Sequence, residues 1–141
     1  MYHTIIIAGN LGRDPEMRYT QAGQAVTSFS VATNRQYTNG KGETIKETLW
    51  FRVTAWGNQA EVCNKYLSKG SKVLVEGRLV GDQDTGGPKI WQGNDGQSKA
   101  SFEINASTVR FLSSRTDSTA QQDGAINQME MDQSIQDDIP F

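Results

Sequence analysis

Residues 1–112 carry mostly the β-branched and alternating patterns that are typical of β-strands. Val, Ile, Thr and aromatic residues are concentrated in five segments, separated by polar stretches that contain glycine or asparagine. The five predicted strands are Thr4–Ala8, Gln24–Arg35, Thr48–Trp56, Ser71–Val80 and Ala100–Leu112. We expect the stretch Gly9–Gly12 to form a turn that closes the first strand.

One segment between the third and fourth strands has helical spacing instead. Ala60, Cys63 and Leu67 recur at intervals of three and four residues, which predicts a helix with one stripe facing the core. Asn58 is expected to be the N-cap residue, and Gly70 is expected to follow the helix at the C′ position.

The order of these elements predicts the fold class. Three strands, a helix and two more strands within about 110 residues follow the order of a five-stranded OB-fold barrel, an all-β fold with its helix between strands three and four. Asn39–Gly42 contains residues that tolerate positive φ and predicts a hairpin turn between the second and third strands. Gly81–Lys99 is expected to be a polar, glycine-rich loop before the last strand. Other five-stranded barrels and small sandwiches fit the same pattern.

The charge and the aromatic content change abruptly near residue 112. Residues 1–112 contain 13 Lys and Arg against 10 Asp and Glu, whereas residues 113–141 contain one basic residue and six acidic ones. Eleven of the twelve aromatic residues lie before residue 113. A segment so polar cannot bury enough surface to offset the entropy of ordering it. We therefore predict one domain over residues 1–112, a disordered linker over 113–136 and an acidic tip over 137–141.

The sequence lacks the features of a membrane protein, a disulfide-bonded protein and a zinc protein. The longest apolar run, Ile5–Ala8, is far shorter than the roughly 20 residues of a membrane span, and no signal-peptide pattern follows the first residue. A single cysteine, Cys63, and a single histidine, His3, leave no material for a disulfide or a zinc site. We expect a soluble protein of a reducing compartment that is not an enzyme and carries no metal or cofactor.

The third predicted strand is the part of the sequence that indicates a function. One of its faces collects the apolar residues, which are Leu49, Phe51, Val53 and Ala55. The opposite face collects Trp50, Arg52, Thr54 and Trp56. Two indoles flanking a guanidinium make a poor core but a good surface for stacking bases beside phosphate. The alternative interpretation is that these tryptophans pack against a loop, a subunit or a protein partner.

Two further aromatic residues and several cations extend this surface as candidates. Tyr37 lies near the predicted hairpin, and Trp91 lies in the loop before the last strand, where it could instead plug the barrel. The candidate phosphate contacts are Arg13, Arg18, Arg35, Arg52, Lys72 and Arg78. A domain with a net charge of only +3 cannot bind by charge alone, so aromatic stacking favours flexible single strands over duplex.

Several motifs along the chain resemble the bacterial single-stranded DNA-binding protein family. They occupy residues 9–16, 50–61, 66–71, 75–79 and 137–141, so the resemblance covers residues 1–112 and the last five. It implies an OB-fold homotetramer that coats single-stranded DNA in replication, recombination and repair, in the cytoplasm and on the nucleoid. It also implies four stacking aromatics, which here are Tyr37, Trp50, Trp56 and Trp91. The segment 82–88 is longer than usual in that family.

The last five residues form a candidate binding motif of their own. Two aspartates precede an apolar end, and the residues are Asp137, Asp138, Ile139, Pro140 and Phe141. Such a segment suits a basic pocket with an apolar floor. The resemblance implies that its partners are replication, repair and restart enzymes. The alternative is an acidic tail that only aids solubility.

The sequence as a whole predicts a sequence-tolerant coat protein for single-stranded DNA. A second possibility within nucleic-acid binding is an RNA-binding or primosome-type OB-fold module. A possibility from another class is a protein-interaction adaptor that uses the tryptophan face as its interface.

Overall fold

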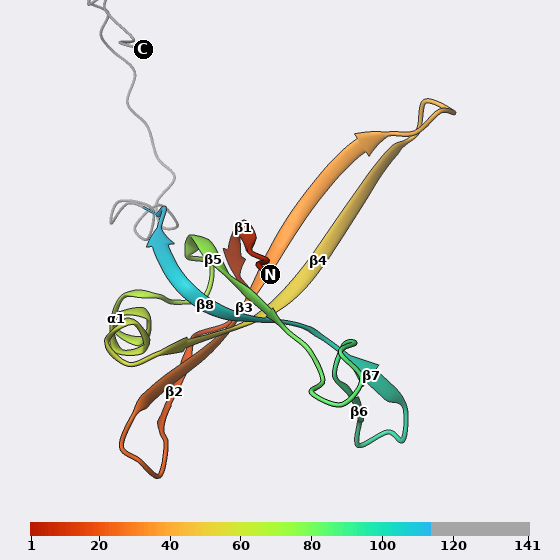
Figure 1. The fold of residues 1–141 in the computed structure, drawn as a ribbon. Helices are drawn as coiled ribbons and strands as arrows, with labels where there is room; N and C mark the ends of the chain where they lie inside the picture. The colour runs from red at the N-terminus through yellow and green to blue at the C-terminus, as the bar shows by residue number, and fades with distance from the viewer. Residues whose placement is uncertain (114–141) are drawn as a thin grey trace, which may run out of the picture.

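The computed structural model describes residues 1–113, and this part of the chain contains eight strands and one helix (Figure 1). The elements are β1 (Ile5–Leu11), β2 (Glu16–Tyr19), β3 (Ala25–Thr38), β4 (Thr44–Trp56), α1 (Asn58–Tyr66), β5 (Lys72–Val80), β6 (Ile90–Gln92), β7 (Ser98–Ala100) and β8 (Phe102–Phe111). The predicted linker and acidic tip lie outside the described residues.

Five of the strands close into a barrel. Their order around the sheet is β1-β5-β8-β4-β3, and β3 pairs back with β1. The pairings are antiparallel except that between β4 and β8, which is parallel. The short strand β2 extends the sheet beyond β3, and α1 connects β4 with β5. The prediction of a five-stranded OB-fold barrel with one helix is confirmed.

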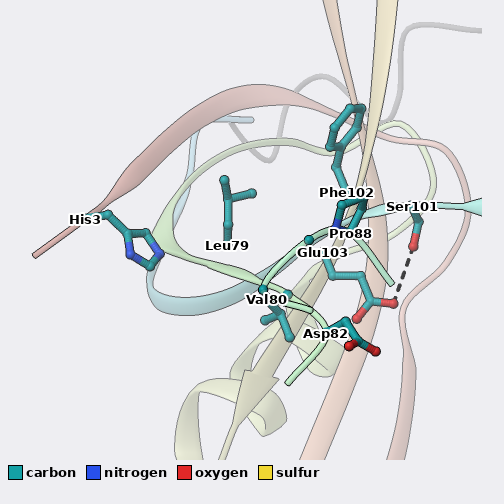
Figure 2. Close-up of a pocket in the computed structure, with 11 residues that line it drawn as sticks. His3, Leu79, Val80, Asp82, Pro88, Ser101, Phe102 and Glu103 are labelled. Carbon is teal, nitrogen blue, oxygen red and sulfur yellow. Dashed lines mark hydrogen bonds between the residues drawn. The ribbon is translucent and has the colours of Figure 1, made fainter. Parts of the chain in front are cut away.

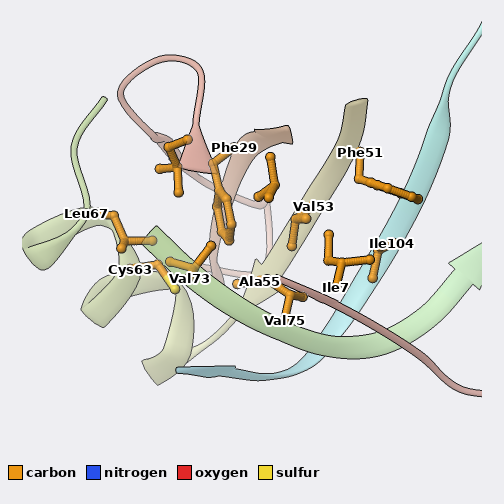
Figure 3. Packing of buried hydrophobic residues seen from close by; sticks show 12 residues of the cluster. Ile7, Phe29, Phe51, Val53, Ala55, Cys63, Leu67, Val73, Val75 and Ile104 are labelled. Atoms are coloured by element: carbon orange, nitrogen blue, oxygen red, sulfur yellow. The ribbon is translucent and has the colours of Figure 1, made fainter. Parts of the chain in front are cut away.

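The barrel interior is filled by alternate side chains of the five strands, and α1 closes one end (Figure 3). Phe51, Val53 and Ala55 of β4 point inward and are buried, as predicted. Leu49 was expected on the same face, but half of its surface is exposed. The reason is that Leu49 lies where β4 leaves the barrel, so its side chain is covered only in part.

The hairpin of β3 and β4 is longer than the sequence pattern predicted and projects beyond the barrel, on the opposite side from α1 (Figure 1). The two strands stay paired up to Thr38 and Thr44. The side chain of Asn39 accepts hydrogen bonds from the backbone N–H groups of Lys41 and Glu43 at 2.9 and 3.0 Å, which closes a tight turn. Because most side chains on both faces of this arm are polar and exposed, the arm carries no hydrophobic alternation.

Both predicted ends of the helix were wrong. Gly57 occupies the N-cap with a φ of 63°, and no side chain caps the helix, so Asn58 is its first helical residue. A positive φ is costly for residues other than glycine, which explains why Gly57 holds this position. At the other end Leu67 is already extended, and Gly70 sits in a turn where its N–H donates to the carbonyl of Leu11.

The stretch Gly9–Gly12 is not the predicted turn, because β1 continues through Leu11. Here β1 turns from its pairing with β5 towards β3, and the two backbones come unusually close. A Cβ on Gly9 would lie 2.1 Å from the carbonyl oxygen of Ala32. Glycine at this position therefore permits the contact that closes the barrel.

The segment between β5 and β8 was predicted as a loop but contains a small hairpin. Strands β6 and β7 pair over three residues each and form a separate two-stranded sheet. Strand β2 was also missed by the sequence pattern. Segments of three or four residues are too short to show a two-residue period, so the pattern could not reveal them.

Candidate nucleic-acid interface

The outer face of β4 carries the two tryptophans that the alternation predicted. Trp50 and Trp56 are 53% and 42% exposed, Arg52 is exposed and Thr54 is half-buried. Their neighbours in the chain point into the barrel, so the backbone of β4 holds this face outward. Two large indoles thus remain open to solvent on a strand that the core anchors.

The neighbouring strand β3 presents small side chains beside the first three residues of this row, which are Trp50, Arg52 and Thr54. In the register, Ala32 lies opposite Trp50, Ser30 lies opposite Arg52 and Ser28 lies opposite Thr54. Paired residues of antiparallel strands point to the same side of the sheet. The indole of Trp50 therefore stands above low neighbours, which leaves room for a flat base next to this ring. Trp56 lies opposite the larger Val26.

The closure of the barrel aligns two of the predicted cations with this face. One row of paired residues runs from Trp50 through Ala32 and Asn10 to Lys72. A second row runs from Thr54 through Asn105 to Arg78. Neighbouring strands lie about 4.8 Å apart, so Arg78 lies about 10 Å from β4 across the sheet.

A third row of paired residues runs from Trp56 through Val26 to Arg18 of β2.

All six predicted phosphate contacts are exposed, namely Arg13, Arg18, Arg35, Arg52, Lys72 and Arg78. Within residues 1–113, the ion pairs that form are Lys89–Glu103 and Lys99–Asp95, so none of these six cations is held by a carboxylate.

Tyr37 lies on the projecting arm, five residues along β3 from the partner of Trp50. At ~3.4 Å per residue this is about 17 Å away. The guanidinium of Arg35 lies 4.9 Å from the centre of the tyrosine ring, and the hydroxyl donates to Glu47 at 3.3 Å. One face of the ring is thus covered by a cation, so a base would have the other face.

Trp91 lies on β6, opposite Lys99 of β7, and is 44% exposed. It is therefore not a buried plug of the barrel. Its hairpin belongs to a different sheet from Trp50 and Trp56, and it lies on another side of the barrel from α1 (Figure 1). Trp91 therefore does not continue the row on β4.

A cavity that the sequence did not reveal opens beside the loop between β5 and β6. Its volume is about 610 Å³, and Figure 2 shows His3 on one side and Phe102 with Pro88 on the other. Backbone N–H groups of Thr85 and Asp84 donate to Asp82 and lower the pKa of its carboxyl group. The loop that builds this cavity has no periodic pattern, so no sequence signal marked it.

Cys63 is buried, and burial raises the pKa of its thiol to about 11, so the thiol remains protonated at neutral pH. Among residues 1–113, no three His, Cys, Asp or Glu side chains gather closely enough to hold a metal ion. None of the helices described here is long and apolar enough to cross a membrane.

Comparisons with known proteins identify relatives of this chain. A model of the Single-strand binding protein family matches residues 2–112. The single-stranded DNA-binding proteins of Wolinella succinogenes and Xanthomonas campestris are 36% and 40% identical over 115 and 111 residues. These alignments cover 82% and 79% of this chain and 67% and 60% of the two relatives, so this chain corresponds to about two thirds of their length.

Solved structures show the same fold. A deletion mutant of the single-stranded DNA binding protein from Thermus aquaticus superposes with a TM-score of 0.61 at 27% identity, covering 79% of this chain and 51% of that one. The Plasmodium falciparum protein in complex with single-stranded DNA superposes with a TM-score of 0.64 at 24% identity, covering 80% and 96%.

The names of these relatives describe DNA binding and not catalysis, in agreement with the expectation that this protein is not an enzyme. The match of the family model spans most of the chain and the whole barrel. This chain belongs to the single-strand binding protein family.

Proposed function

We propose that this protein binds single-stranded DNA without sequence preference, by stacking bases on Trp50 and Trp56 while Arg52 meets the phosphates. The observation that carries the proposal is the row of exposed indoles around Arg52 on the outer face of an anchored strand. Every base has a flat π face, so stacking tolerates any sequence.

The binding surface that we propose is larger than this row. Tyr37 and Trp91 offer two more exposed rings on two separate hairpins, and a strand of DNA that reaches both must pass along the barrel. Lys72 and Arg78 lie in register with the tryptophan row and are free of ion pairs within residues 1–113. They are suited to contact phosphates between the stacking positions.

Intrinsic fluorescence tests the proposal directly. Saturating oligo(dT) should strongly quench the emission of the tryptophans, because stacking on a base quenches an indole. A duplex of equal length should change the emission much less, since its bases are already stacked and paired. An emission spectrum that stays unchanged at saturating oligo(dT) would contradict base stacking on this face.

The wider role that we propose is that of a homotetrameric coat protein in DNA replication, recombination and repair, located on the nucleoid. The support is the resemblance of its motifs and the names of its relatives. The exposed Ile6 on β1 offers an apolar surface for contact between subunits. Multi-angle light scattering measures the number of subunits, and a monomer at micromolar concentration would contradict the tetramer.

We also propose that residues 137–141 recruit enzymes of DNA replication, repair and restart. Deleting Phe141 should leave the affinity for DNA nearly intact and remove these partners from a pull-down, because the apolar end is lost while the barrel is unchanged. Deleting residues 132–141 should even tighten DNA binding slightly at low salt, since three acidic residues no longer compete with phosphate.

Titrations of the full-length and shortened proteins at two salt concentrations measure this effect, alongside mass spectrometry of the captured proteins. Loss of DNA binding in the shortened protein, or an unchanged set of captured proteins, would show that the tip has a different role.

A further inference from the structure

We propose that Gly12 is a positioning residue for Trp50: the missing side chain leaves a seat that sets the orientation of the indole for stacking. This inference rests on the proposed function, because it concerns how the ring meets a base. Gly12 directly follows β1, and its N–H donates to the carbonyl of Ser30 at 3.1 Å.

The indole of Trp50 occupies the space where a side chain of residue 12 would be. A Cβ built on Gly12 would lie 2.5 Å from Cζ3 and 2.7 Å from Cη2 of Trp50. These atoms form the far edge of the six-membered ring. The edge of the indole therefore rests against the backbone of Gly12.

The backbone conformation of Gly12 does not itself demand glycine. Six glycines of residues 1–113 have a positive φ, and Gly12 is not one of them. An L-residue could adopt this backbone conformation, so the glycine is explained by the space that the indole takes up.

The register explains how a residue of β4 reaches the end of β1. Strand β3 lies between the two, and its residue opposite Trp50 is Ala32, which also pairs with Asn10 of β1. The small side chain of Ala32 lets the ring extend across β3 to Gly12. The rest of the indole remains half exposed, so one edge is seated while the ring stays accessible.

A seated ring loses less conformational freedom when a base stacks on it, which favours binding. In a Gly12→Ala variant the nearest clashing atoms are the far end of a side chain, so the ring should turn away while the barrel keeps its shape. We expect the affinity for oligo(dT) to fall by about two- to tenfold, the effect of holding a side chain away from its preferred rotamer.

The orientation of the ring is measured in a background where Trp50 is the only tryptophan, made by the changes Trp56→Phe and Trp91→Phe. In this background Gly12→Ala should shift the emission of Trp50 in the DNA-free protein. It should also make the indole more accessible to the quencher acrylamide. The matched control is Gly87→Ala, because the nearest atom to a Cβ there lies at an ordinary 3.6 Å and its φ is not positive. The control should leave emission and affinity unchanged.

A double-mutant cycle then separates a positioning role from a structural one. If Gly12 acts through the indole, Gly12→Ala should have no further effect on oligo(dT) affinity once Trp50→Ala is present. In a Trp50→Phe background, Gly12→Ala should lower the oligo(dT) affinity less than it does beside the native Trp50, since a phenyl ring is shorter than an indole. These comparisons also hold if Gly12→Ala lowers the melting temperature, because the cycle compares the effect of the same substitution with and without Trp50.

Three results would overturn the inference: an unchanged Trp50 emission in the DNA-free variant, an equal loss of affinity with and without Trp50, or no loss of affinity at all. Failure of the proposed function would look different. In that case Trp50→Ala itself would leave the oligo(dT) affinity unchanged, and Gly12 could have no role in stacking. The emission shift caused by Gly12→Ala would still show that Gly12 sets the orientation of the indole.

Discussion

Replacing Phe29 with alanine should lower the free energy of unfolding by about 3–5 kcal/mol, the usual cost of removing a buried phenylalanine. Phe29 is 1% exposed and lies in the barrel section of β3, opposite the buried Val53. The strands around it are tied together by closure of the sheet, so the cavity cannot collapse easily. Chemical denaturation at a fixed protein concentration measures the loss.

The control for this change is Tyr2→Ala, which removes an exposed ring that lies before β1. Its effect should stay within about 0.5 kcal/mol, as is usual at the surface. A loss below about 1.5 kcal/mol for Phe29→Ala would mean that the barrel interior relaxes far more than its closed topology implies.

Replacing Trp50 or Trp56 with alanine should weaken the binding of oligo(dT) by about 1–3 kcal/mol each, which is the range for the loss of one stacked base. The two indoles are six residues apart on one strand, or about 20 Å. At that distance their effects should add, so the double variant should lose about 2–6 kcal/mol. Fluorescence anisotropy of a labelled oligonucleotide measures the affinities.

The matched control is Tyr66→Ala, because Tyr66 is an equally exposed aromatic residue but lies on α1. It should keep the affinity of the parent protein. All these variants should also keep their assembly state and melting temperature, since their side chains lie on the surface. A tryptophan variant that dissociates in light scattering while its subunits still bind DNA would show that the face is a subunit interface.

The strand pattern predicted the two features on which the proposed function depends. Hydrophobic alternation along residues 50–56 assigned Phe51, Val53 and Ala55 to the core and the two tryptophans to the outside, and the structure confirms both. This prediction was possible because a side chain's direction along a strand follows from its position alone. The order of the elements likewise predicted the barrel, since an OB-fold has five strands and this order places the helix between the third and the fourth.

Other features depend on contacts between residues that are distant in the chain. Local propensity placed the helix N-cap at Asn58, whereas the conformation of Gly57 sets it one residue earlier. The arm beyond Leu49 is held by pairing and by its turn, with no buried face that a pattern could reveal.

The local pattern thus assigned the residues of the proposed stacking face, whereas barrel closure set their surroundings. Pairing of β1 with both β3 and β5 brings Lys72 into register with Trp50, and it places Gly12 beneath the indole. These neighbours are separated from Trp50 by more than twenty residues in either direction. Side-chain alternation is a property of one strand, but register between strands depends on how the whole sheet closes.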